Sequence, residues 1–241
     1  SGQHQRMEAR DRDTTFIFGG GANSRTSSRL KTPEYDIFNL PKGAATGTLV
    51  HGILETVDFS SKNEAEIESL VSEKVEQSGF DPNWVFPICQ MVRNVAEVEL
   101  DSVFGTFKLA GVPPSEKLNE LEFYYPLRRL GRSEMTKLFA DCIGSPFGNN
   151  FPSKVGNLRF EPLHGVMRGF IDLIVRANGR FYLIDWKSNF LGSDVRDYGP
   201  EALRGCIEEN FYSLQYYLYS VALHQYLKAR IPGYSYETHF G

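Results

Sequence analysis

The stretch that most constrains the fold is residues 169–189, GFIDLIVRANGRFYLIDWKSN. Two apolar arms flank Asn178-Gly179, a pair favoured at the central positions of a type I′ turn, and this arrangement predicts a β-hairpin. Each arm carries an acid where Val or Ile would be the ordinary choice. Counting outward from the turn, Asp172 lies directly opposite Asp185, with the two Cβ atoms about 4.5–5.5 Å apart.

The two faces of this hairpin differ in chemistry. Side chains alternate along a strand, so Lys187 shares the face of Asp185 while Trp186 points the other way. Facing carboxylates destabilise a sheet, and either Lys187 or a cation bound between Asp172 and Asp185 compensates. The alternative is a solvent-exposed polar face with an ordinary Asp–Lys pair. The other face is wholly apolar and is predicted to be core: Ile171, Leu173, Val175, Tyr182, Ile184 and Trp186.

Apolar periodicity predicts the elements around the hairpin. Three helices are expected at 46–59, 63–79 and 81–100, with Pro87 kinking or delaying the third. Helices before a strand, a hairpin and a long helix indicate an α/β or α+β domain. The remaining predicted elements are a strand at 118–127, a short helix at 133–144, and a long helix over about 201–230 with an apolar stripe of Ile207, Phe211, Leu214, Leu218 and Val221.

Composition limits the class of protein. The 241 residues, 41% hydrophobic and 23% charged, fit one large domain or one domain with an accessory lobe. Residues 1–34 are rich in Ser, Gly, Arg and Thr and are predicted to be an arm or linker, beginning with what resembles a cloning remnant. The net charge of −4 disfavours a uniformly basic nucleic-acid surface but leaves room for a local basic track.

Other classes are excluded by missing signals. Three widely spaced cysteines without a CxxC pair argue against zinc ribbons and four-cysteine iron–sulfur clusters, and they favour a reducing, cytoplasmic location. No apolar run reaches the roughly 18 residues of a membrane span, so no membrane partner is expected. Without GxxxxGK[ST], the chain offers no ATP site of its own.

The hairpin motif resembles a known family. Asp172, followed 13 residues later by Asp185-Trp186-Lys187, is similar to the D…(D/E)xK pattern of PD-(D/E)xK nucleases. More narrowly, residues from about 35 to 241 resemble the C-terminal nuclease domain of RecB, the beta subunit of exodeoxyribonuclease V. The resemblance implies a restriction-endonuclease-like core at about 116–241, with a central mixed sheet flanked by helices, and a helical part at about 46–100. It is carried in the family's order by 40–59, 118–127, 165–192 and 214–241.

The resemblance also implies roles for individual residues. Asp172 and Asp185 match the metal-binding acids, His51 a metal-ligating histidine and Lys187 the catalytic lysine. The carbonyl of Trp186 completes the metal's inner shell in related sites. On the expected helix His51 lies roughly 130° from the centre of the apolar stripe at 100° per residue, so it is not a core histidine. A surface histidine is the alternative that the residues alone leave open.

Supporting positions follow in the same way. Glu120 matches an upstream acid of the family, and Glu122 is its rival if the alignment is shifted by two residues. Gln215 and Tyr219 match a QxxxY motif, and their i, i+4 spacing places them on one helix face. Their alternative is a pair of amphipathic residues at a helix boundary. A basic run of Arg128, Arg129 and Arg132 is expected to contact the DNA backbone, although a solvated charge run is the default interpretation.

The function that follows from the resemblance is Mg²⁺-dependent hydrolysis of DNA phosphodiesters, leaving 5′-phosphate and 3′-hydroxyl ends. Mn²⁺ is expected to substitute, and Ca²⁺ to bind without supporting cleavage. The family implies single-stranded DNA delivered from duplex ends, a helicase part of RecB, RecC-like and RecD-like subunits and a RecA-type recombinase, in double-strand-break repair. The alternatives are a stand-alone nuclease and an inactive docking module. Because the family's last strand would follow HFG, the chain is interpreted as a fragment.

Overall fold

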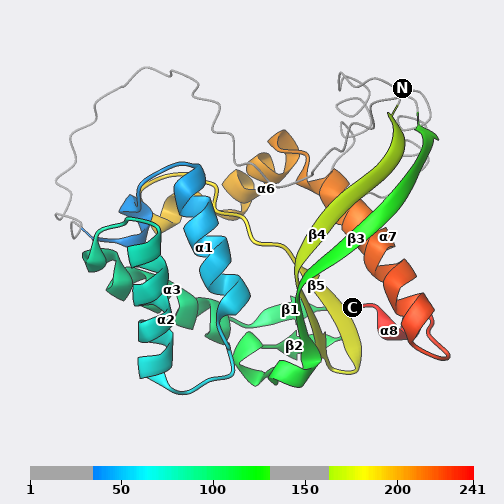
Figure 1. Cartoon of the computed structure of the whole chain (residues 1–241), viewed down its shortest axis with the longest axis horizontal. Coiled ribbons are helices and arrows are strands. Elements are labelled where there is room, and N and C mark those ends of the chain that lie inside the picture. The colour runs from blue at the N-terminus through cyan, green and yellow to red at the C-terminus, as the bar shows by residue number, and fades with distance from the viewer. Residues whose placement is uncertain (1–34, 131–162) are drawn as a thin grey trace.

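The computed structural model of the chain describes residues 35–130 and 163–241. Helices α1, α2 and α3 come first, a three-stranded sheet of β3, β4 and β5 follows, and α6, α7 and α8 close the chain (Figure 1). The helix predicted at 133–144 lies outside the described residues. The described part is a mixture of helices and strands, as predicted, and its strand ladders are antiparallel.

The three predicted N-terminal helices are confirmed with shorter ends. They are α1 (Ala44–Thr56), α2 (Glu64–Gln77) and α3 (Val85–Glu97). Pro87 does not kink α3, because it is the third residue of the helix, where a missing N–H breaks no intrahelical hydrogen bond. A 3₁₀ turn, Pro82–Trp84, precedes the helix instead.

The hairpin forms with the predicted turn. Strands β4 (Leu163–Ala177) and β5 (Arg180–Ile184) are joined by Asn178 and Gly179, whose φ values of 51° and 76° are those of a type I′ turn. The register is also as predicted, since Ala177 faces Arg180. The sheet order is β3 (Lys117–Leu130), β4, β5, and both of its ladders are antiparallel.

The predicted direct pair of Asp172 and Asp185 does not form. The β4–β5 ladder ends at the pair Leu173 and Ile184, one step before the two acids. Asp172 instead accepts a hydrogen bond from the backbone N–H of Trp186, with an N···O distance of 2.8 Å. The Asp172 carboxylate thus takes the place of the next backbone acceptor of the ladder. Asp185 is therefore not paired with a residue of β4 in the ladder.

Both faces of the sheet are covered, one by α1–α3 and the other by α7 (Tyr212–Arg230) (Figure 1). Leu173 and Val175 pack into the cluster that contains the buried residues of α1, α2 and α3. Ile171 and Ile174 pack instead with Leu223 and other residues of α7. The prediction that Ile171 shares a face with Leu173 and Val175 is therefore wrong.

This change of face has a local cause. Asp172 and Leu173 are consecutive, yet Asp172 lies beside His51 of α1 and Leu173 packs into the α1–α3 cluster. At the same level of β3, Asn119 hydrogen-bonds the backbone of α1 and Glu120 has a left-handed φ of 48°. The side-chain alternation is thus interrupted in both strands at once, so the register continues unchanged on either side.

The long helix predicted over 201–230 is two helices. These are α6 (Pro200–Glu209) and α7, and Phe211 between them has a left-handed φ of 55°. Helical phase does not carry across such a residue, so the predicted stripe is wrong: Ile207 and Val221 are 39% and 41% exposed. The buried side chains of α7 are Ser213, Tyr219, Ser220, Ala222, Leu223 and Leu227.

Small elements complete the described chain. Strands β1 (Leu100–Ser102) and β2 (Gly105–Phe107) form a short hairpin, and α8 (Tyr236–His239) precedes the last residues. Next to β5, Phe181 and Phe240 form an isolated parallel bridge. None of the described helices combines the length and the apolar character that crossing a membrane requires.

Candidate metal and hydrolytic site

One half of the candidate site is built from α1 and β4. His51 and Glu55 lie one turn apart on α1, and Asp172 of β4 faces them. One possible ligand atom from each of these three side chains lies within 4.8 Å of the other two. His51 Nδ1 is 3.6 Å from Asp172 Oδ2, and the two side chains are 21% and 14% exposed. We call His51, Glu55 and Asp172 the α1 half of the site.

Helix α1 is held in place by its buried face and by β3. Leu49 and Ile53 are almost fully buried, so His51 and Glu55 lie at the edge of the core and not within it. Asn119 Nδ2 donates to the carbonyl oxygen of Glu55 at 2.5 Å. Just beyond the helix, Lys117 Nζ lies 3.2 Å from Asp58 Oδ1. These contacts fix the distance between α1 and the strands that carry the acids.

Negative charge accumulates in the α1 half. Burial raises the pKa of Glu55, and the carboxylates of Glu120 and Asp172 raise it further, outweighing the opposite effects of His51 and Lys74. Two carboxylates and an imidazole in this arrangement are ligands that suit a hard divalent cation. The donor set therefore fits the metal that the sequence motif implies.

The other half of the site is built from the end of β5 and from α7. Asp185 Oδ2 lies 2.6 Å from Lys187 Nζ, and each side chain is 19% exposed. Gln215 Nε2 donates to Asp185 Oδ1 at 3.3 Å and to the hydroxyl of Tyr219 at 2.9 Å. The predicted common face of Gln215 and Tyr219 is thus confirmed. Burial raises the pKa of Tyr219 to about 12, so its hydroxyl stays protonated at neutral pH.

Two contacts of Tyr212, one of them with Lys187, were missed by the sequence analysis. Its Nζ lies 4.6 Å from the ring centre of Tyr212, and the Tyr212 hydroxyl donates to Asn189 Oδ1 at 2.9 Å. The available signal was the position of Tyr212, three residues before Gln215, because i, i+3 residues share a helix face. We call Asp185, Lys187, Tyr212, Gln215 and Tyr219 the α7 half of the site.

The structure separates the two candidate acids of β3. Glu120 lies at the level of Asp172, and its charge acts on Glu55. Glu122 is exposed and forms an ion pair with Arg168. The hydrogen bond from the Tyr124 hydroxyl, at 2.9 Å, and then Arg168 lower the pKa of Glu122. Of the two, Glu120 is the acid whose charge reaches the α1 half.

The backbone and the side chain of Trp186 make different contacts. Its backbone N–H holds Asp172, while its ring packs against Phe59 with the ring centres 6.1 Å apart. The prediction that its side chain points away from the acids is confirmed. The strand β3 includes Arg128 and Arg129, whose side chains the structure does not describe, and Arg132 lies outside the described residues.

Glu55 is a functional candidate to which the sequence analysis assigned no role. The available signal was its spacing of four residues from His51 on one amphipathic helix. Its neighbours Asp172 and Glu120 come from strands more than sixty residues later in the chain, so only the fold brings them to it.

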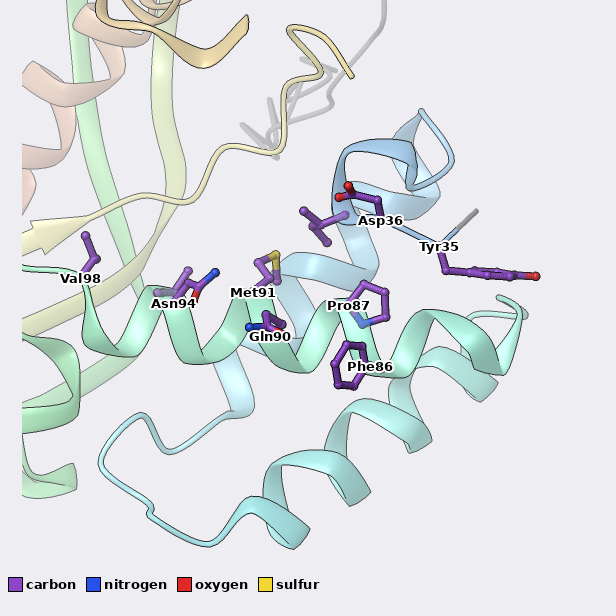
Figure 2. Close-up of a pocket in the computed structure, with 10 residues that line it drawn as sticks. Tyr35, Asp36, Phe86, Pro87, Gln90, Met91, Asn94 and Val98 are labelled. Carbon is purple, nitrogen blue, oxygen red and sulfur yellow. The ribbon is translucent and has the colours of Figure 1, made fainter. Parts of the chain in front are cut away.

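A separate groove of about 460 Å³ runs along α3 and residues 35–37 (Figure 2). Its lining is mostly apolar and includes Phe86, Met91 and Val98. None of the residues of the α1 half or the α7 half lines it, so the groove is not part of the candidate site.

Comparison with known proteins identifies the family. The model of the PD-(D/E)XK nuclease superfamily matches residues 25–235, a span that includes both halves of the site. The chain belongs to the PD-(D/E)XK nuclease superfamily. Asp185-Trp186-Lys187 agrees with the (D/E)XK pattern in the name of this superfamily, and Asp172 precedes it by 13 residues.

Curated relatives agree with this assignment. The chain is 34% identical over 216 residues to the RecBCD enzyme subunit RecB of Escherichia coli (strain K12), covering 89% of the chain and 17% of that protein. It is 33% identical over 218 residues to RecB of Haemophilus influenzae, covering 90% and 17%. For RecB of Mycobacterium tuberculosis the identity is 33% over 229 residues, covering 84% and 20%. The chain thus spans about a fifth or less of the length of these relatives.

Proposed function

We propose that this chain is the nuclease domain of a RecBCD-type helicase–nuclease and hydrolyses DNA phosphodiester bonds with a divalent cation. The observation that carries the proposal is the convergence of three elements: α1 brings His51, β4 brings Asp172, and the end of β5 brings Asp185 and Lys187. The match to RecB relatives over most of the chain supports the same function.

Residues of both halves would hold the cation, which we propose to be Mg²⁺. His51, Asp172, Asp185 and the carbonyl of Trp186 supply nitrogen and oxygen ligands, and Mn²⁺ would substitute for Mg²⁺. A bound cation supplies polarisation of a phosphate oxygen and a lower pKa for a water molecule. The N–H of Trp186 fixes the Asp172 carboxylate, so this ligand is positioned before the cation arrives.

Lys187 has the electrostatic role in the reaction. Its ammonium group is held by Asp185 and by the face of Tyr212, and this fixes it where negative charge develops on the phosphate in the transition state. Gln215 holds Asp185 from the other side and is itself bound to Tyr219. Glu120 would orient the cation or the water from the β3 side. The products would carry 5′-phosphate and 3′-hydroxyl ends.

Binding of the substrate and partners belongs to the same proposal. Arg128 and Arg129 would contact the phosphate backbone of a single strand delivered from a duplex end by the helicase part of RecB. RecC-like and RecD-like subunits and a RecA-type recombinase are the proposed partners in repair of double-strand breaks. A stand-alone nuclease is the second candidate, and an inactive docking module is the third. The complete set of His51, Asp172, Asp185 and Lys187 disfavours the docking module.

The test is a cleavage assay on the purified chain. Single-stranded and duplex DNA are incubated with Mg²⁺ or with EDTA, and the wild type is compared with Asp185→Ala, Lys187→Ala and Lys228→Ala. Lys228 is an exposed lysine of the last turn of α7 and serves as the matched control. We expect Mg²⁺-dependent cleavage by the wild type and by Lys228→Ala only. Cleavage that EDTA does not abolish, or that survives in Asp185→Ala, would refute the proposal, and DNA binding without cleavage would favour the docking module.

A further inference from the structure

We propose that Glu55 is a direct ligand of the divalent cation, together with His51 and Asp172. This inference rests on the proposed metal-dependent function and assigns a ligand that the PD-(D/E)XK motif does not contain. It adds a third residue of the α1 half to the ligands proposed above.

The distances in the α1 half match a single bound ion. Oxygen ligands lie about 2.0–2.6 Å from Mg²⁺ or Ca²⁺, so two ligands on opposite sides of one ion are about 4.0–5.2 Å apart. One atom from each of His51, Glu55 and Asp172 lies within 4.8 Å of the other two. All three side chains can therefore reach the same ion without a change of backbone. Among the described residues, Asp185 is not a member of this group.

The carboxylate of Asp185 differs from that of Glu55 in its contacts. Its Oδ2 is 2.6 Å from the Lys187 ammonium, and its Oδ1 accepts from Gln215. For Glu55, by contrast, the strongest charge effects come from two carboxylates, those of Glu120 and Asp172. A bound cation would offset the repulsion between these carboxylates.

The backbone of Glu55 is held in a fixed position, as a metal ligand requires. Glu55 lies one turn after His51 on α1, so both side chains project toward Asp172 from one helix face. Asn119 of β3 donates to the Glu55 carbonyl oxygen, which ties this turn of α1 to the sheet. A carboxylate on a rigid helix is better placed for coordination than one on a mobile loop.

A further carboxylate changes what the site binds. Affinity for divalent cations in oxygen-rich sites increases with the number of charged ligands. Glu55 therefore gives the cation two carboxylates and one imidazole within the α1 half, independently of the ion pair of Asp185 with Lys187. Removing Glu55 should weaken binding of the ion while leaving Lys187 where it is.

The experiment measures binding of Mn²⁺ to the whole chain by isothermal titration calorimetry, without DNA. The variants are Glu55→Gln, which removes the charge, and Glu55→Asp, which keeps the charge but withdraws it by one methylene. Glu68→Gln, at an exposed position of α2, is the matched control. We expect Glu55→Gln to lower the Mn²⁺ affinity on the order of 10- to 100-fold. Glu55→Asp should also bind more weakly than the wild type, and Glu68→Gln should bind as the wild type does.

The outcomes separate the inference from the proposed function. Glu55→Gln or Glu55→Asp binding Mn²⁺ as tightly as the wild type would overturn the role of Glu55 alone. Failure of the wild type to bind Mn²⁺ would overturn the proposed function and this inference together. Thermal unfolding without metal checks that each variant is folded, and Glu55→Asp carries the test if Glu55→Gln is not.

Discussion

The two halves of the site use charge in opposite ways. In the α7 half, the acid Asp185 lies 2.6 Å from the ammonium of Lys187, so charge is compensated within the protein. In the α1 half, burial raises the pKa of Glu55, and the charges of Glu120 and Asp172 raise it further. The ion pair of the α7 half needs no bound cation, whereas the α1 half is stabilised when a cation binds.

This difference teaches how one hairpin serves two tasks. Asp172 and Asp185 lie next to the end of the β4–β5 ladder, yet Asp172 lies beside α1 and Asp185 beside α7. We infer that the α1 half sets the affinity for the cation and that the α7 half sets the rate once the cation is bound. Variants in the two halves should therefore separate binding from turnover.

The largest expected effect comes from the α7 half. Lys187→Ala removes the ammonium group that faces the negative charge developing on the phosphate. Cleavage at saturating Mg²⁺ should therefore fall by roughly 10²–10³-fold. Its Mn²⁺ affinity should not fall, because the variant removes a positive charge from beside Asp185. Cleavage rates and calorimetric Mn²⁺ titration check the two expectations. A variant whose activity returns when Mg²⁺ is raised would contradict this division of tasks.

The next effect comes from the α1 half. His51→Ala removes one ligand atom but leaves Lys187 untouched, so the Mn²⁺ affinity should fall about 10- to 100-fold. Cleavage should recover as the Mg²⁺ concentration is raised, because the α7 half is intact. Titrating the cleavage rate against Mg²⁺ tests this, with Lys187→Ala as the variant that does not recover. If His51→Ala loses the same activity at every Mg²⁺ concentration, the two halves do not have separate roles in binding and turnover.

A smaller effect is expected from the aromatic support of Lys187. The ring of Tyr212 lies 4.6 Å from the Lys187 ammonium, and such a contact is worth about 0.5–2 kcal/mol. Tyr212→Leu should lower kcat roughly 2- to 30-fold with little change in KM, which identifies Tyr212 as a positioning residue. Tyr212→Phe keeps the ring and should behave as the wild type. If Tyr212→Phe is equally impaired, the hydrogen bond to Asn189 matters and the ring does not.

The smallest effect is on stability in the absence of metal. The folded chain raises the pKa of Glu55 above its ordinary value of 4.5, so stability is lost as the pH rises through the interval between the two values. Glu55→Gln lacks this proton, and its unfolding midpoint relative to the wild type should rise with pH across the interval and then stay constant. Thermal unfolding in EDTA at a series of pH values measures this. A constant difference at every pH would show that folding does not raise the pKa of Glu55.

The sequence was most informative where a local rule governs structure. Asn178-Gly179 dictates a type I′ turn, and the turn fixes the register of β4 and β5. The spacing of Gln215 and Tyr219 likewise predicted a shared helix face. These features depend on residues that are close in sequence, so the pattern alone is sufficient to predict them.

The features that the sequence missed depend on tertiary packing. Neither Gly nor Pro is present at Glu120 or Asp172 to indicate that the side-chain alternation is interrupted there. The interruption arises where α1 and α7 cover opposite faces of the sheet. The helix break at Phe211 is similar, because an aromatic residue in a left-handed conformation is unusual. Glu55 was missed because its partners are distant in sequence.

The most direct measurement is the position of the cation. Crystals of the chain grown with Mn²⁺ would show the ion by its anomalous scattering. The account predicts one peak about 2.0–2.6 Å from a ring nitrogen of His51 and from a carboxylate oxygen of Asp172, with Lys187 beside it but not bound to it. A peak held in the α7 half without His51 and Asp172, or no peak at either half, would contradict the division on which the account rests.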